Sequence, residues 1–161
     1  MVVLATGFDA MTGTLNRIAI TGRDGLTLRR TWEPGPSCYL GLASHGFPNL
    51  FVVTGPGSPS VLSNMVVSIE QHVEFIAGLL SWMGERGHTR VEADAEAERS
   101  WVDHVRELAE ATLYVRAPSW YVGANVPGKP RVFMPYVGGV GAYRAECEAV
   151  AEAGYKGFAF A

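Results

Sequence analysis

The sequence predicts an α/β fold with short strands, two long helices and a long loop. An apolar run at Leu50–Thr54 precedes a loop with two glycines and two prolines, which indicates a strand that leads into a helix. In the helix that follows, predicted over Ser63–Gly84, apolar residues recur every three or four positions. They predict one buried stripe, formed by Met65, Ile69, Val73, Ile76, Leu80 and Met83.

Four further short strands are predicted before this loop, because short apolar runs alternate there with turn signals. The second and third are expected to form a hairpin, since the turn signal Gly22–Gly25 lies between them. The four strands are Val2–Ala5, Leu15–Ile20, Leu26–Trp32 and Tyr39–Ala43.

Both long helices carry signals for where they begin. Ser63 is the predicted N-cap of the first. The second is predicted over Ala93–Leu113, and Thr89 and Glu92 have the spacing of a capping box in front of it. Its buried side is expected to consist of Trp101, Val105, Leu108 and Leu113.

Residues Tyr114–Gly141 show neither helical nor strand periodicity, and four prolines interrupt them. A structureless stretch of more than about 15 residues in a compact domain usually has a function or is disordered. Because Ser119–Gly139 holds four aromatic residues, we expect an ordered, movable loop that covers a site. A short helix at Tyr143–Ala153 and a strand at Gly157–Phe160 complete the predicted fold.

Composition excludes several classes of protein. The 161 residues suit one domain, and a net charge of −3 without a basic cluster argues against nucleic acid as a partner. No apolar run reaches the roughly 20 residues that a bilayer demands, and there is no signal peptide, so a cytoplasmic protein without a membrane partner is expected. Cys38 and Cys147 form no C-x-x-C motif and are expected to be reduced thiols. The four histidines lack metal-site spacing, so no metal is expected.

Three segments resemble one enzyme family. They are VVLATGFDAMTGTL at Val2–Leu15, GPGSPSVLSNMVVSIEQHVEF at Gly55–Phe75 and SWYVGANVPGKPRVFMPYVGG at Ser119–Gly139. Together they resemble the C-terminal third of Baeyer–Villiger monooxygenases, most closely the phenylacetone and cyclohexanone type. The resemblance covers essentially the whole chain, and the strings ATGFDA and SWYxGANVPGK are specific to this family.

The resemblance implies the C-terminal segment of a flavoprotein with two dinucleotide-binding domains, α+β-like when taken alone. Residues 1–161 are then a single C-terminal portion of the FAD-binding domain, with the FAD loop and the NADP domain upstream of this chain. The family uses FAD, NADPH and dioxygen to convert a small-molecule ketone to an ester or lactone.

Several family features are missing from the sequence. No G-x-G-x-x-G loop and no F-x-G-x-x-x-H-x-x-x-W fingerprint occurs, and the active-site arginine of the family lies upstream. The chain therefore looks like a fragment with no catalytic residue of its own, inactive alone and dependent on the upstream half of the same enzyme.

The resemblance also assigns roles around the start of the long helix. The backbone of Asn64 and Met65 is expected to face the flavin of FAD, where a helix dipole favours negative charge. The substrate pocket is expected to be lined by a bulge, in which a valine at position 61 narrows the pocket slightly. This bulge consists of Ser60, Val61 and Leu62.

Trp120 in the long loop is expected, by resemblance, to reach the NADP ribose and close over the nicotinamide. Asn125 and Lys129 lie on the same loop, and Lys129 either meets a phosphate or is only solvated.

Thr6 and Gly7 follow the first predicted strand and are expected to help bind a cofactor, because Gly7 lets the chain approach a ligand or turn sharply. The family places the junction between the NADP and FAD domains there. Asp9 is expected to cap the turn Ala10–Gly13 rather than act as an acid or base.

Two other functions stay open from the residues alone. One is a non-catalytic ligand-binding or interaction module. The other is a related flavin monooxygenase that oxidises sulfides or amines. In an isolated module, the long helix would lack the strands that complete its sheet and would expose an apolar face.

Overall fold

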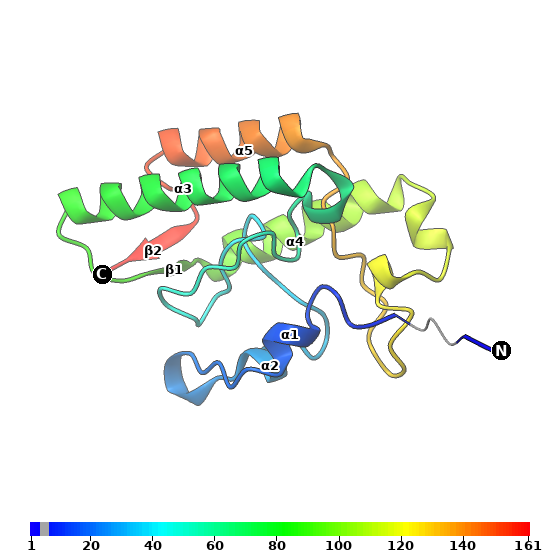
Figure 1. The fold of residues 1–161 in the computed structure, drawn as a ribbon. Coiled ribbons are helices and arrows are strands. Elements are labelled where there is room, and N and C mark those ends of the chain that lie inside the picture. The colour runs from blue at the N-terminus through cyan, green and yellow to red at the C-terminus, as the bar shows by residue number, and fades with distance from the viewer. Residues whose placement is uncertain (4–6) are drawn as a thin grey trace.

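The computed structural model describes residues 1–3 and 7–161, which form five α-helices and one small sheet (Figure 1). The described helices are α1 Gly13–Asn16, α2 Leu28–Thr31, α3 Met65–Glu85, α4 Ala95–Glu110 and α5 Val140–Glu152. The strands are β1 Val91–Ala93 and β2 Phe158–Phe160. Four 3-10 turns are Arg23–Gly25, Ser60–Leu62, Tyr114–Arg116 and Trp120–Val122. The predicted mixed fold with short strands, two long helices and a long loop is confirmed.

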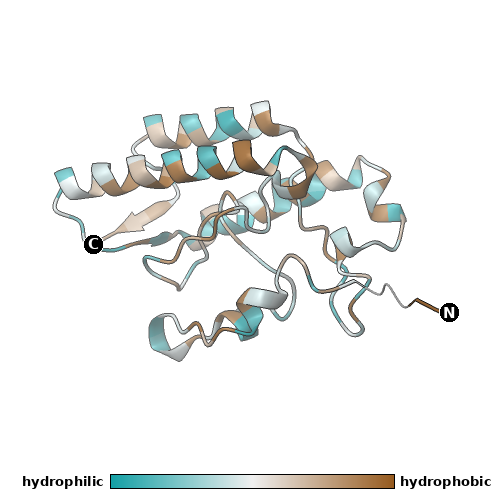
Figure 2. Cartoon of the chain, in the orientation of Figure 1, coloured by the Kyte–Doolittle hydropathy of each residue, from teal (hydrophilic) through white to brown (hydrophobic). Residues whose placement is uncertain are grey.

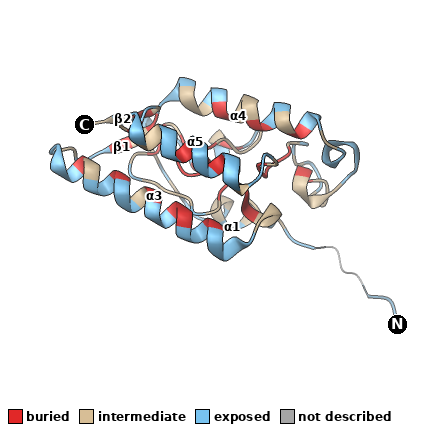
Figure 3. Ribbon diagram, turned by 90° about the horizontal axis from the view of Figure 1, so that it is seen from above, coloured by how far each residue is buried: buried red, intermediate tan, exposed pale blue. Residues whose placement is uncertain are grey.

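The main core lies between α3, α4, α5 and the sheet. Helices α3 and α5 lie side by side, which both views show (Figures 1 and 3). Each of the three helices contributes buried side chains, among them Phe75 and Leu79, Trp101 and Val105, and Tyr143 and Cys147.

The sheet pairs β1 with β2 in antiparallel register, with Val91 opposite Phe160. The predicted terminal strand is therefore confirmed. The predicted capping box is wrong, because its residues lie in front of and within β1. Asp94 caps α4 instead, and its Oδ1 accepts hydrogen bonds from the backbone N–H groups of Glu96 and Ala97 at 2.9 and 3.1 Å.

Helix α4 is shorter than predicted at both ends. Trp101 and Val105 are buried as expected, and Leu108 packs against the core. Leu113 lies beyond the helix and is 74% exposed, so its expected burial is wrong.

Helix α3 buries a different face from the one predicted. Its N-cap is Asn64 rather than Ser63, and the Asn64 side chain accepts a hydrogen bond from the Val66 amide. The buried side chains are Ser68, Gln71, His72, Phe75, Leu79 and Met83. The predicted stripe is wrong except for Met83 and the partly buried Ile76, since Met65, Ile69, Val73 and Leu80 are all exposed.

The reason is that α3 carries apolar residues on both faces. Its outer face is largely exposed in Figure 3, and hydrophobic residues cover its N-terminal end in Figure 2. Helical periodicity alone therefore did not distinguish the face that packs on α5 from the face left open in this chain.

Four of the five strands predicted before α3 are wrong. The predicted hairpin is replaced by α1, α2 and one isolated bridge between Thr21 and Thr27. Leu28 and Trp32, four residues apart, both point into a small core with Cys38 and Phe47, which is the spacing of a helix.

The next two predicted strands also differ. Tyr39–Ala43 is a tight turn closed by a single bridge, and Leu40 has a φ of 54° inside it. At Leu50–Thr54 the Val52 amide reaches the Leu42 carbonyl at 2.8 Å, but no strand forms within the described residues. The predicted strand Val2–Ala5 lies partly outside the described residues.

The C-terminal elements agree with the sequence. Between α4 and α5 the chain forms only two short 3-10 turns, so the predicted absence of long helices and strands there is confirmed. That this loop moves and covers a site stays a prediction. Helix α5 begins three residues before the predicted helix Tyr143–Ala153 and ends one residue before its end.

Candidate functional site

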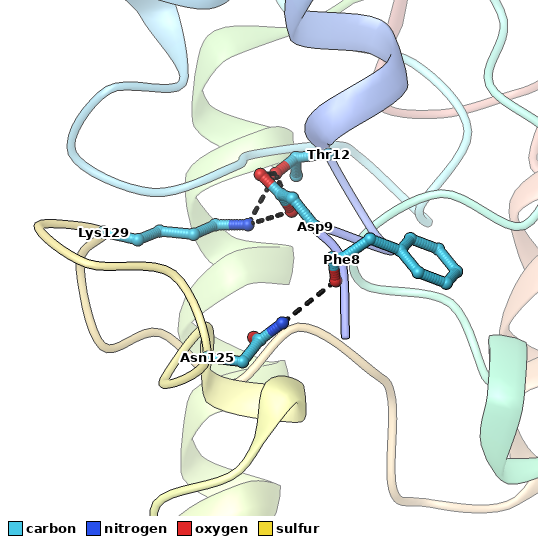
Figure 4. A network of polar contacts seen from close by, with 5 residues as sticks. All are labelled: Phe8, Asp9, Thr12, Asn125 and Lys129. Atoms are coloured by element: carbon cyan, nitrogen blue, oxygen red, sulfur yellow. Dashed lines mark hydrogen bonds and ion pairs between the residues drawn. The ribbon is translucent and has the colours of Figure 1, made fainter. Parts of the chain in front are cut away.

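Three segments that are far apart in the sequence meet in space. The Gly57 amide donates to the Met134 carbonyl at 2.7 Å, and the Tyr136 amide donates to the Ser58 carbonyl at 2.8 Å. Met134 and Tyr136 belong to the long loop that follows α4. At the tip of this loop, Asn125 contacts Phe8 in the segment that follows residue 6 (Figure 4). The long loop, residues 119–139, therefore joins the glycine-rich loop, residues 54–60, to the N-terminal segment, residues 7–12.

Hydrogen bonds within the glycine-rich loop and from α4 hold this loop in place. The Ser58 hydroxyl donates to the Gly55 carbonyl at 2.7 Å, and the Trp101 indole of α4 donates to the Gly57 carbonyl at 3.0 Å. Ser60 is buried with a φ of 43°, a conformation that costs a non-glycine residue about 1 kcal/mol or more. These hydrogen bonds and the backbone conformation of Ser60 therefore fix how the loop leads into α3.

The bulge Ser60–Leu62 is a 3-10 turn directly before α3. Val61 and Leu62 are partly exposed, whereas Ser60 is buried. Leu62 packs on a small cluster that includes Val122 and Phe133 of the long loop. The bulge and the long loop therefore share one apolar contact.

The start of α3 offers free hydrogen-bond donors. The Asn64 Oδ1 accepts from the Val66 amide at 3.0 Å, and no acidic residue lies in the first turn. The amides of Met65 and Val67 donate no hydrogen bond to any residue that the structure describes. The positive end of a 21-residue helix is therefore open to an electron-rich group.

A buried network behind the loop was not predicted from the sequence. The Thr54 amide donates to Nδ1 of His72 at 2.8 Å, so the ring proton lies on Nε2. Nε2 then donates to the Tyr143 hydroxyl at 2.9 Å, which donates to the Leu40 carbonyl at 2.6 Å. Burial lowers the pKa of His72 to about 4, so the ring is neutral at pH 7. No sequence signal identified this histidine, because its partners come from distant segments.

Trp120 lies in the 3-10 turn Trp120–Val122 of the long loop. Its ring lies against that of Tyr121, with ring centroids 4.2 Å apart and 31° between the planes. Trp120 is partly exposed, and its indole N–H has no acceptor among the described residues. This donor is available to a ligand.

The tip of the long loop is fastened to the N-terminal segment (Figure 4). The Asn125 amide donates to the Phe8 carbonyl at 2.9 Å. The Lys129 ammonium group donates to Asp9 and, at 2.7 Å, to the Thr12 hydroxyl. The sequence left open whether Lys129 meets a phosphate or is only solvated. In the structure it forms an ion pair within the chain, with Asp9.

Asp9 takes part in the turn as expected, because its carbonyl accepts from the Gly13 amide at 3.1 Å and its carboxylate from the Thr12 hydroxyl. Burial raises the pKa of Asp9, but the hydrogen bonds of Lys129 and Thr12 and the charge of Lys129 together outweigh burial, and the net pKa is lowered. Gly7 has a φ of 73° and lies next to the Asn125 side chain. Thr6 lies outside the described residues.

Comparison with known proteins identifies this arrangement. The sequence is 48% identical to acetone monooxygenase (methyl acetate-forming) from Gordonia sp. (strain TY-5) over 160 residues, which are 99% of this chain and 30% of that protein. It is 39% identical to cyclohexanone 1,2-monooxygenase from Acinetobacter sp over 98% of this chain and 29% of that protein. Over its length, the chain belongs to the Baeyer–Villiger monooxygenase family.

Solved structures of this family agree with the sequence comparison. Cyclohexanone monooxygenase from Rhodococcus sp. Phi1 bound to NADP+ matches with a TM-score of 0.93 and 40% identity over 97% of this chain and 29% of that one. Steroid monooxygenase bound to NADP matches with a TM-score of 0.88 and 52% identity, over 96% of this chain and 29% of that one. The chain thus spans about 30% of its relatives and matches their C-terminal part. No family model matches it.

Neither a metal-ligating cluster nor a reactive thiol is found among the residues that the structure describes. No group of three or more metal-ligating side chains and no helix long and apolar enough to cross a membrane occurs among the described residues. Cys38 and Cys147 are free and buried, and burial raises their pKa values to about 12 and about 11. Neither thiol therefore ionises at neutral pH.

Proposed function

We propose that this chain supplies the C-terminal part of an FAD- and NADPH-dependent monooxygenase that converts a ketone to an ester or lactone. One observation carries the proposal most directly. Hydrogen bonds join the three segments that resemble the family, and one of these segments holds the open start of α3. When bound, FAD supplies the redox and oxygen chemistry. This chain helps to bind and orient the cofactors and the ketone and to shield them from water.

The residues at the start of α3 fit the electron-rich edge of a flavin. The free amides of Met65 and Val67 are donors at the positive end of the helix dipole. Asn64 acts by fixing the helix start, because its side-chain oxygen is already used as the cap. Gly7 and Thr6 are proposed to lie at the junction between the two dinucleotide-binding domains.

Trp120 is the proposed contact to NADP(H). Its indole N–H is a donor without a described acceptor, which suits a ribose hydroxyl. Asn125 and Lys129 are poorer candidates, because both are occupied by the N-terminal segment.

The proposed wall of the ketone pocket is the bulge before α3. Val61 and Leu62 offer partly exposed apolar side chains, and buried Ser60 fixes the conformation of the turn. An apolar wall orients a small ketone without competing for its carbonyl.

The remaining part of the enzyme is the proposed partner of this chain. The exposed apolar side chains of α3, among them Val66, Ile69 and Val73, form a surface that water does not favour. The same remaining part is proposed to carry the catalytic arginine and both phosphate-binding loops.

A chimera tests the proposal. The matching 160-residue segment of acetone monooxygenase from Gordonia is replaced by this chain. We expect NADPH- and dioxygen-dependent formation of an ester or lactone from a ketone, with no activity from the 161-residue chain alone. A chimera that binds FAD and oxidises NADPH but oxygenates sulfides or amines instead of ketones would contradict the ketone assignment.

The flavin contact has its own test in the chimera. Met65→Pro removes the amide donor at the first helical position, where proline is tolerated, and the extended Asn64 (ψ 112°) suits a following proline. We expect FAD affinity to fall about five- to tenfold, measured by fluorescence titration, because a donor to a charged edge is lost. Met65→Ala is the control, since it removes the same side chain but keeps the amide. Equal FAD affinity in both variants would contradict this contact.

A further inference from the structure

The long loop is fastened to the rest of the chain at two separate places. At its C-terminal limb, backbone hydrogen bonds join Met134 and Tyr136 to the glycine-rich loop. At its tip, side chains make the connection, and we call these residues the N-terminal latch. The latch consists of Asp9, Thr12, Asn125 and Lys129.

We propose that the N-terminal latch sets the position of Trp120, and that Lys129 is its central positioning residue. This inference rests on the proposed function for the role of Trp120, but the latch itself is a physical property of this chain. It assigns Lys129 to loop positioning rather than to binding a phosphate.

A continuous chain of contacts leads from the latch to Trp120. The aliphatic part of Lys129 lies over Gly123, where an added Cβ would come within 3.0 Å of the Lys129 Cδ. Gly123 has a φ of 71° and ends the 3-10 turn that begins at Trp120. Its amide donates to the Trp120 carbonyl at 3.0 Å. The Lys129 side chain therefore packs against the residue that closes the Trp120 turn.

The charged end of Lys129 is well placed to hold this geometry. The Lys129 and Asp9 side chains are only 14% and 22% exposed, so water screens their attraction less than at an open surface. Thr12 donates to Asp9 and accepts from Lys129, which fixes the direction of both groups. Asn125 adds a second, uncharged attachment to the Phe8 carbonyl.

The two fastenings predict a local response. Amides at the tip depend on the latch, and they belong to Val122, Gly123, Ala124 and Val126. The amides of Gly57 and Tyr136 bridge the other limb to the glycine-rich loop. Loosening the latch should therefore release the tip and leave the other limb in place.

Hydrogen–deuterium exchange of the full 161-residue chain tests the latch. In Lys129→Met we expect the four tip amides to exchange about tenfold faster, with Gly57, Tyr136 and α3 unchanged. Asp9→Asn should act similarly, and the double variant should add little, because both remove one interaction. The control is Lys156→Met, which changes the other lysine of the chain, an exposed one. Unchanged tip exchange, or equal acceleration across α3, overturns the proposal.

Kinetics of the chimera test what the latch does. If the tip is closed in a smaller fraction of molecules, the apparent affinity for NADPH falls by that fraction. We expect Lys129→Met to raise the KM for NADPH about fivefold at a nearly unchanged kcat, and Lys129→Arg to restore it in part. Faster tip exchange with an unchanged KM overturns the positioning role. An inactive chimera speaks against the proposed function only, and exchange then decides whether the latch exists.

Discussion

Replacing Trp101 with alanine is expected to lower the free energy of unfolding by about 3–5 kcal/mol. Trp101 is 7% exposed, and its ring stacks on Tyr136 with centroids 5.5 Å apart and 9° between the planes. Its indole also donates to the Gly57 carbonyl at 3.0 Å. The substitution therefore opens a cavity in the core and leaves a carbonyl of the glycine-rich loop without its donor. Urea denaturation measures the loss.

Two further variants separate these effects. Trp101→Phe keeps most of the ring but removes the donor, so a smaller loss of about 1–3 kcal/mol is expected. Leu113→Ala is the control, because Leu113 lies beyond the C-terminal end of α4 and is exposed. This substitution should change the free energy of unfolding by less than about 0.5 kcal/mol. A loss for Leu113→Ala as large as that for Trp101→Ala contradicts the described packing of α4.

The second large effect is a loss of stability in acid caused by His72. Its pKa is lowered from 6.5 to about 4 in the folded chain by burial, so the unfolded chain takes up the proton first. Stability is therefore complete above about pH 7 and falls as the pH drops through the unfolded value toward the folded one. We expect His72 to account for about 2 kcal/mol of lost stability between pH 7 and pH 5, measured by denaturation at each pH.

Variants isolate the contribution of this histidine from that of the carboxylates. His72→Gln cannot take up a proton, so its free energy of unfolding should lose about 2 kcal/mol less over the same interval. His88→Gln is the matched control, because His88 is a partly exposed histidine outside the buried network, and it should follow the unchanged chain. The assignment fails if His72→Gln and the unchanged chain lose stability in parallel.

The candidate site shows what sequence patterns can and cannot supply. The three family segments were recognisable as strings, and the open start of α3 followed from a glycine-rich loop before an apolar helix. The ion pair of Lys129 with Asp9 was not predictable, because 120 positions separate the two residues and neither carries a local signal of the other. The same holds for His72, whose three connected partners are Thr54, Tyr143 and Leu40.

The sequence by itself determined the features that depend on neighbouring residues. Helices α3, α4 and α5 and the terminal strand follow from apolar spacing, helix-forming residues and the glycines and prolines around them. The irregular course of residues 114–139, which holds only two short 3-10 turns, likewise follows from its prolines and its lack of periodicity.

Tertiary structure alone decided the features that depend on a partner. A strand needs a neighbouring strand to bond with, and Leu50–Thr54 has only the bond from the Val52 amide to the Leu42 carbonyl. Leu28 and Trp32 instead bury their side chains together on one face of a short helix. Helix α3 is apolar on two faces, so its sequence allowed either to be buried. The face with Ser68 and His72 is buried, and hydrogen bonds with Ser63, Thr54 and Tyr143 satisfy polar groups there, a condition that no helical period encodes. Gln71 lies on the same face, but its Oε1 is buried without a partner among the described residues.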